Sequence, residues 1–225
     1  MSLIHRVEKA LPPRLLRRLR AAVRRLGCER LRSTYQTTFW FDLGEPAAIV
    51  EQAVLALRPL VPQTDITGVE WWLSRMHTRD VRVDFHQDRD EKLALRTGAL
   101  RHPLISSVLF LNRVRGGALA VTAQPPDPAN PASVPLPLDA DLVAPRPNRL
   151  VWFDGRLTHG VLDADNRVPR TRSKEPGELR ITLVMNWWSR RPEGIPVFRE
   201  RAIYAALKAR RPLQAAAIPF RPDRA

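Results

Sequence analysis

An imidazole and a carboxylate, two side chains that commonly bind metals, stand two residues apart in the segment 81–88. The alternation of apolar and polar residues in this segment predicts a β-strand, whose successive side chains point to opposite faces. His86 and Asp88 would then share one face, while apolar side chains cover the other. The spacing therefore predicts a strand that presents two metal ligands to a polar site.

A third ligand is offered by His159, in a strand or turn within residues 148–161. Two imidazoles and one carboxylate on one face of a metal leave neighbouring coordination positions open, which suits non-haem Fe(II) and lets O2 and a substrate-derived ligand bind together. Taken alone, a His-X-Asp tripeptide is also compatible with a satisfied surface pair. The other three histidines have no ligand-like partner at a useful spacing and predict surface or structural roles: His5, His77 and His102.

Composition limits how such a metal can be held. The 225 residues and the hydrophobic content of 44% suit one sizeable domain with a real core. A single cysteine, Cys28, excludes an internal disulfide framework and a thiolate zinc site. No apolar run approaches the roughly 20 residues that span a bilayer, and the first residues lack the order of a signal peptide, so a cytoplasmic location without membrane contact is expected.

The formal net charge of +14 raises the possibility of a nucleic-acid partner, because a basic face is what phosphate binding requires. Only four of the 37 basic residues are Lys, however, and the arginines are scattered along an Ala- and Pro-rich chain. A GC-rich genome produces such an excess of Arg, Ala and Pro without selection for any binding partner. A nucleic-acid partner stays open but is not favoured.

The elements that must position the ligands are mostly short strands. They are expected at residues 35–41, 69–76, 81–88, 105–111, 117–122, 149–153 and 180–187, as an antiparallel sandwich or open barrel. Eight prolines in residues 124–148 predict a surface loop, and the charged segment 163–178 predicts an exposed loop or lid. The core 69–188 would be supported by residues 1–62 and by a helix at 197–210, within a single domain.

Two helices are expected before the main sheet. Leu15, Leu19, Val23 and Leu26 recur at helical spacing with arginines on the other side, which predicts an amphipathic helix packed on the core, although a membrane or phosphate surface is an alternative. A second helix begins at Pro46 and ends before residue 59.

Several short motifs in order carry a family resemblance. They are His86-Gln87-Asp88, residues 107–112 (SVLFLN), residues 116–119 (GGAL), His159 and residues 180–183 (RITL). Together they resemble the signature of Fe(II)/2-oxoglutarate-dependent dioxygenases, with the prolyl 4-hydroxylase-like branch as the most similar, over about residues 69–188.

The resemblance implies a mainly β fold with flanking helices, a double-stranded β-helix (jelly roll, cupin-like). It implies Fe(II) bound by His86, Asp88 and His159, with 2-oxoglutarate and O2 as cosubstrates. Arg180 takes the place of the family's basic residue, whose guanidinium can pair with the distal carboxylate of 2-oxoglutarate, and Thr182 can add a hydroxyl donor. Further expected cosubstrate positions are Val108, Phe110, Asn112 and Leu119.

The sequence departs from this pattern in two places. The segment 163–178 lengthens the spacing between His159 and Arg180, so that Arg167, Arg170 and Arg172 are rivals for the carboxylate. Arg180 is preferred because it begins a convincing strand, which holds a ligand better than a loop. Phe110 stands where the branch often has a Tyr, so the hydrogen bond of that hydroxyl is missing.

The activity implied is hydroxylation of an unactivated C–H bond of an amino acid, peptide or small natural-product intermediate, with succinate and CO2 as co-products. Demethylation is a related outcome, and Asp88 argues against halogenation. The alternatives are a jelly-roll metal-binding protein without redox turnover, or a basic nucleic-acid-binding or demethylating protein. Arg82, which shares the expected strand face of His86, and Trp72 are candidate substrate contacts, although Arg82 could pair with an acid and Trp72 could belong to the core. The oligomeric state is open.

Overall fold

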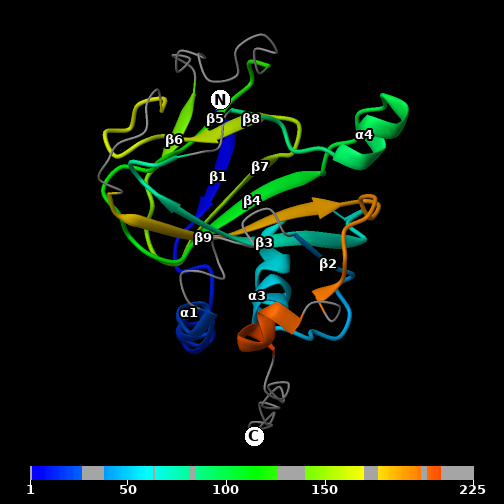
Figure 1. The fold of residues 1–225 in the computed structure, drawn as a ribbon, viewed down its shortest axis with the longest axis horizontal. Helices are drawn as coiled ribbons and strands as arrows, with labels where there is room; N and C mark the ends of the chain where they lie inside the picture. The colour runs from blue at the N-terminus through cyan, green and yellow to red at the C-terminus, as the bar shows by residue number, and fades with distance from the viewer. Residues whose placement is uncertain are drawn as a thin grey trace, which may run out of the picture.

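The computed structural model describes residues 2–26, 38–62, 64–81, 85–125, 140–169, 177–198 and 202–208. Two antiparallel sheets lie one above the other, and helices cover the outer face of the larger sheet (Figure 1). This layered, mainly β arrangement confirms the expected double-stranded β-helix.

The larger sheet has six strands in the order β1-β7-β4-β9-β3-β2. Its centre is rigidly paired, because β3 and β9 match over all ten residues from Gly68 opposite Trp188 to His77 opposite Leu179. The strands are β1 (Ile4–Val7), β2 (Phe39–Phe41), β3 (Gly68–His77), β4 (Ile105–Phe110), β7 (Arg149–Asp154) and β9 (Leu179–Trp188).

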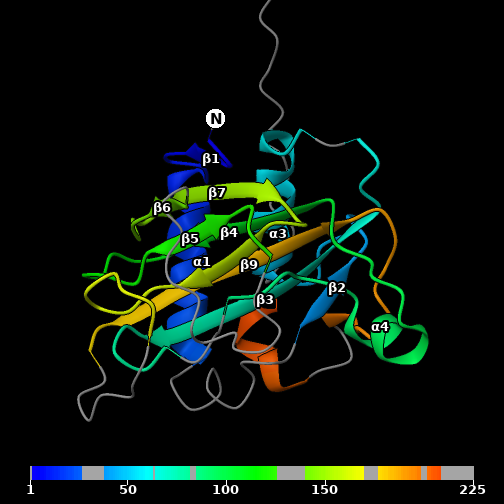
Figure 2. The ribbon, with the colours of Figure 1, turned by 90° about the horizontal axis from the view of Figure 1, so that it is seen from above.

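The smaller sheet has three short strands in the order β6-β5-β8. They are β6 (Asp141–Val143), β5 (Leu119–Thr122) and β8 (Thr158–Val161). Figure 2 shows the strands of both sheets from above. An apolar cluster fills the space between the two sheets, formed by Val108, Phe110, Val151 and Phe153 from the larger sheet with Leu119, Val121 and Val143 from the smaller one.

The outer face of the larger sheet is covered by two helices. In α1 (Pro13–Leu26), Leu15, Leu19 and Val23 are buried while most of the arginines face solvent, which confirms the amphipathic helix packed on the core. α3 (Ile49–Leu57) begins where Glu51 accepts hydrogen bonds from the backbone N–H groups of Ala47 and Ala48, and a 3-10 turn, η1 (Arg58–Leu60), follows it. No helix in the described ranges is both long and apolar enough to cross a bilayer.

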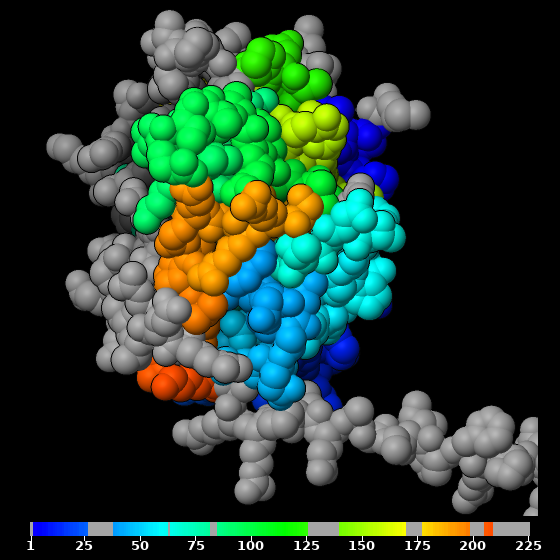
Figure 3. Space-filling model, turned by 90° about the vertical axis from the view of Figure 1, so that its right-hand side faces the viewer, coloured from blue at the N-terminus to red at the C-terminus, as the bar shows by residue number. Residues whose placement is uncertain are grey.

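The strand β1 and the helix α4 (Glu91–Thr97) were not expected from the sequence. The Asp90 carboxylate caps α4 by accepting the backbone N–H of Leu93, and Gly98, with φ 74°, ends it. Lys92 and Arg96 of α4 lie against Glu193 and Gly194 after β9, where the green helix meets the orange segment in Figure 3.

Three expectations about elements need correction. Residues 85–88 form no strand, since His86 makes only an isolated bridge; residues 82–84 lie outside the described ranges. The proline-rich region contains β6 at its end, with residues 126–139 outside the described ranges. The expected helix at 197–210 is represented by a 3-10 helix, η3 (Ala202–Leu207). The described parts of 163–178 form turns, apart from the last residues before β9.

Candidate metal centre and cosubstrate pocket

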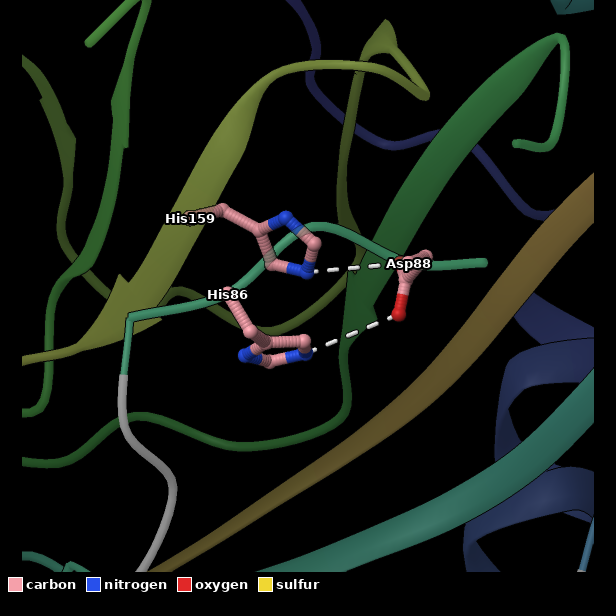
Figure 4. A group of neighbouring side chains, drawn as sticks. All are labelled: His86, Asp88 and His159. Carbon is pink, nitrogen blue, oxygen red and sulfur yellow. Dashed lines mark ion pairs between the residues drawn. The ribbon is translucent and has the colours of Figure 1, made fainter. Parts of the chain in front are cut away.

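The three predicted metal ligands come together in one group (Figure 4). The potential ligand atoms of His86, Asp88 and His159 all lie within 4.8 Å of one another. Nε2 of His86 lies 3.6 Å from Asp88 Oδ1, and Nε2 of His159 lies 3.3 Å from Asp88 Oδ2. Two imidazole nitrogens and a carboxylate therefore point at one place, which is the donor set of a non-haem Fe(II) site.

A backbone bridge, rather than a strand face, aligns the two histidines. The N–H of His86 donates to the carbonyl of His159 at 3.0 Å, and the N–H of His159 donates back at 2.9 Å. Gly160 allows the two segments to approach, because a Cβ there would lie 2.7 Å from the Phe85 ring. Gln87 adds a third link by donating from Nε2 to the carbonyl of Arg156 at 2.8 Å. The metal group thus sits where the segment before α4 joins β8.

Asp88 is held from the larger sheet. The hydroxyl of Ser106, on β4, donates to Asp88 Oδ2 at 3.0 Å, and Nδ1 of His102 lies 2.7 Å from the backbone carbonyl of Asp88. Burial by itself would raise the pKa of Asp88, but the imidazoles of His159 and His86 hold this pKa well below its usual range. The residue is therefore a carboxylate, the form that binds a cation.

The two histidines differ in their surroundings. The His159 side chain is 10% exposed, its ring centroid lies 5.1 Å from that of Phe153, and its Nδ1 lies 3.2 Å from the carbonyl of Leu157. That contact suits an Nδ1–H donor and leaves Nε2 as the ligand atom. The His86 side chain is 42% exposed. His86 is accordingly the more solvent-accessible of the two histidines.

The predicted cosubstrate residues lie on the inner face of the larger sheet, facing the smaller sheet. Arg180 is buried, with Cζ 5.0 Å from the centre of the Phe110 ring and Nε donating to the carbonyl of Gly117 at 3.0 Å. Gly117 has φ 65°, a left-handed conformation that favours glycine. Thr182 is fully buried, and its Oγ1 has no hydrogen-bond partner among the described residues. A guanidinium next to an unpartnered hydroxyl fits the distal carboxylate of 2-oxoglutarate.

A crystal structure of a Pseudomonas putida prolyl-4-hydroxylase is similar to this chain, with a TM-score of 0.51 and 21% sequence identity over 85% of this chain and 90% of that one. This chain has the prolyl-4-hydroxylase fold. Two other crystal structures align more loosely. AviO1 from Streptomyces viridochromogenes aligns with a TM-score of 0.49 and 17% identity over 86% of this chain and 92% of its own.

HygX from Streptomyces hygroscopicus, with nickel and 2-oxoglutarate bound, aligns with a TM-score of 0.48 and 12% identity over 88% of this chain and 83% of its own. No protein-family model and no curated protein sequence matches the chain.

The other predicted cosubstrate positions lie between the two sheets or at the start of β9. Val108 and Leu119 are buried between the sheets. The Asn112 side chain donates to the carbonyl of Leu179 at 2.7 Å and accepts the N–H of Ile181 at 2.9 Å, so it fixes the start of β9 on either side of Arg180. Asn112 therefore positions the strand that carries Arg180.

The remaining predicted residues are the candidate substrate contacts, the rival arginines and the histidines outside the metal group. The half-buried Trp72 lies on the inner face of β3, opposite Val184 of β9. Arg167 is exposed in a turn. Arg82, Arg170 and Arg172 lie outside the described residues. His5 stacks on Trp152 with ring centroids 3.8 Å apart, and His77 contacts the carbonyl of Gly177, which agrees with structural roles for both.

Sequence reasoning missed three polar residues on the inner face, Ser106, Asn186 and Glu70. Asn186 lies opposite both Ser106 and Glu70 in the sheet register. Nε1 of Trp188 donates to Glu70 Oε2 at 3.2 Å, while burial and then the charge of Asp88 raise the pKa of Glu70 to about 7. The alternation of side chains along β3 could have identified Glu70, because it stands among apolar residues and shares the face of Trp72.

Proposed function

We propose that the protein is an Fe(II)- and 2-oxoglutarate-dependent oxygenase that hydroxylates an unactivated C–H bond of an amino acid, a peptide or a small natural-product intermediate. The observation that carries the proposal is the convergence of His86, Asp88 and His159 at the junction between the two sheets. The fold supports it, since a prolyl-4-hydroxylase has the same architecture.

The residues of this chain would hold the reacting groups. His86 and His159 would bind Fe(II) through their Nε2 atoms, and Asp88 would bind it as a carboxylate held by the Ser106 hydroxyl. When bound, Fe(II) and 2-oxoglutarate supply the oxidising chemistry that activates O2, and succinate and CO2 are released.

Recognition of the cosubstrate would depend on Arg180 and Thr182. A buried guanidinium binds a carboxylate strongly because little water competes with the pair. The ring of Phe110 supports the guanidinium but has no hydroxyl to donate, so Thr182 supplies the additional donor.

The proposal is tested by adding Fe(II) and 2-oxoglutarate to the protein without air. A weak visible charge-transfer band is expected in the wild type and in His5→Ala, whose imidazole stacks on Trp152 away from the group. The band should be absent in His86→Ala. A well-folded wild-type protein that gives no band would refute the proposal.

The role of Arg180 is tested by the 2-oxoglutarate concentration that half-saturates the band. Removing a charged hydrogen-bond partner weakens such binding about ten- to a hundredfold, so Arg180→Ala should need that much more cosubstrate. Arg180→Lys keeps the charge, so its half-saturating concentration should lie between those of the wild type and Arg180→Ala. Arg167→Ala should have the same half-saturating concentration as the wild type. If Arg167→Ala has the larger effect, the exposed turn binds the carboxylate instead.

Turnover separates an oxygenase from a metal-binding jelly roll. Incubation with O2 and candidate metabolites, amino acids or peptides should release succinate and add one oxygen atom to the substrate, measured by mass spectrometry. A band without any succinate would favour a metal-binding protein without redox turnover. Steep salt-dependent binding to phosphate polymers would instead favour a nucleic-acid partner.

A further inference from the structure

A row of polar side chains crosses the inner face of the larger sheet beside the metal group. The strands β4, β9 and β3 are neighbours in the larger sheet (Figures 1 and 2). In their register, Ser106 of β4 lies opposite Asn186 of β9, which lies opposite Glu70 of β3. Ser106 donates to the metal ligand Asp88. The row therefore begins at the metal centre and ends at Glu70, a carboxyl that the proposed metal and cosubstrate sites do not use.

Asn186 is only 2% exposed, and its Oδ1 has no hydrogen-bond partner among the described residues. A buried carbonyl oxygen without a donor costs free energy, because it has lost its hydrogen bond to water without replacement. This oxygen lies between Ser106 and Glu70 in the sheet register, where it could accept a hydrogen bond from a bound molecule.

Glu70 is the second acceptor of the row. Trp188 Nε1 donates to one of its oxygens, and the Thr38 hydroxyl also bonds the carboxyl. The charged groups that act on it from the packed segments are the carboxylates of Asp88 and Asp90, and no Lys or Arg in the described part of the chain forms an ion pair with it. The Glu70 carboxyl thus has two carboxylates near it and no ion-pair partner among the described residues.

Apolar surface lies beside this row. Trp72 of β3 lies opposite Val184 of β9, and both side chains are only half-buried. Trp72 is two residues after Glu70, and Val184 is two residues before Asn186, so all four side chains share one face of the sheet. A carbon chain lying on Trp72 and Val184 can therefore place its polar end at Glu70 and Asn186.

We propose that Glu70 and Asn186 bind a protonated amine of the substrate, so that the oxygenase acts on amine-bearing molecules. The inference rests on the proposed function, because it places this amine beside the metal site. An ammonium group has three N–H donors and no acceptor, which suits a carboxylate and a carbonyl oxygen facing it together. Its positive charge would favour the ionised form of Glu70, which burial and then the nearby carboxylates of Asp88 and Asp90 disfavour.

The probes are pentylamine, which is protonated at neutral pH, and 1-pentanol, a neutral molecule of the same length. The protein is loaded with 2-oxoglutarate and with Zn(II), a diamagnetic substitute for Fe(II). The indole N–H resonance of Trp188, assigned with Trp188→Phe, reports on Glu70 because the two groups are hydrogen-bonded. Pentylamine should shift this resonance at concentrations at which 1-pentanol does not.

The variants identify the residues that bind the amine. Glu70→Gln, which keeps the shape of the side chain, should weaken pentylamine binding about ten- to a hundredfold, and Asn186→Ala should also weaken it. The matched control Glu91→Gln changes an exposed glutamate of α4 and should bind as wild type. Equal responses to amine and alcohol, or unchanged binding in both Glu70→Gln and Asn186→Ala, would overturn the proposal.

The two proposals fail separately, because this readout needs neither O2 nor turnover. Amine binding that depends on Glu70, in a protein that gives no charge-transfer band with Fe(II) and 2-oxoglutarate, would retain the amine site and remove the oxygenase. A normal charge-transfer band without amine binding would retain the oxygenase and remove the amine site.

Discussion

The larger and the smaller sheet contribute to the site in different ways. The larger sheet has two fully paired ten-residue strands at its centre and a helix-covered outer face, and it carries Arg180, Thr182, Asn186 and Ser106. The smaller sheet has strands of three or four residues and contributes one of the three potential metal ligands, His159 of β8. His86 and Asp88 belong to neither sheet's strands and reach the group from the segment before α4.

The contrast indicates a division between recognition and metal binding. The side chains proposed to recognise parts of small molecules are placed on the strands with the most extensive pairing, where their positions are best defined. The potential metal ligands come from short segments that meet at the junction, and hydrogen bonds to both sheets hold them there. Substitutions in the two regions should therefore have separable effects.

The largest effect is expected for Asp88→Ala. This substitution removes a ligand from the junction but no residue from a strand, so we expect Fe(II) affinity to fall by more than the roughly hundredfold that loss of a ligand's supporting contact can cause. The fold, followed by circular dichroism, should be retained. Loss of structure together with loss of metal binding would contradict the separation of the two regions.

A matched pair of leucines compares the stability of the two sheets. Leu183 of β9 is fully buried between the sheet and the helices, while Leu119 of β5 is buried between the two sheets. We expect Leu183→Ala to lower the free energy of unfolding by about 4 kcal/mol and Leu119→Ala by about 2–3 kcal/mol. Denaturant titration measures both, and the reverse order would show that the smaller sheet is the more tightly packed.

Glu70→Gln should stabilise the metal-free protein at high pH. The pKa of Glu70 is about 7 in the fold against an ordinary value of 4.5, so the folded state holds its proton more tightly than the unfolded chain does. Ionisation of Glu70 therefore does not lower the free energy of unfolding below about pH 4.5, and it lowers this free energy by up to about 3 kcal/mol above pH 7. Thermal melts at pH 4.5 and 8 should show stabilisation by Glu70→Gln only at pH 8, whereas Glu91→Gln should show no such difference.

Two neighbouring serines on opposite faces of β4 give the smallest and sharpest test. Ser106→Ala removes the donor to Asp88 and should weaken metal binding about tenfold. Ser107 instead donates to the carbonyl of Met185 and accepts from Trp187 Nε1. Ser107→Ala should lower the free energy of unfolding by about 1 kcal/mol and leave metal affinity unchanged. Equal metal affinities in the two variants would mean that Ser106 has no part in holding Asp88.

The chemistry of the metal group could be predicted from residue types, but its geometry could not. His86, Asp88 and His159 were identified by their types, spacing and order along the chain, and they do converge. The expected reason, a shared strand face, was wrong, because His86 makes a single bridge to His159 instead of extended pairing. That bridge depends on a contact between distant segments, which local alternation does not encode.

Long strands with clear alternation were predicted closely, as β3 and β9 illustrate. The short helix α4 was missed because it has no buried face to give an apolar period, and its Leu95 is 86% exposed. Asn186 could not be identified in advance either. Asn186 is distinguished by a buried side-chain oxygen that accepts no hydrogen bond from the described residues. This property arises only when three strands that are far apart in sequence come together in the sheet.

The backbone bridge between His86 and His159 also affects the entropy of metal binding. Two reciprocal hydrogen bonds fix the peptide groups of both ligands before any metal arrives, and their ring centroids lie 4.6 Å apart. Most of the loss of chain freedom needed to bring two distant histidines together has therefore occurred during folding. The two histidines are therefore preorganised for chelation, and a bound metal would restrict little more than side-chain rotations.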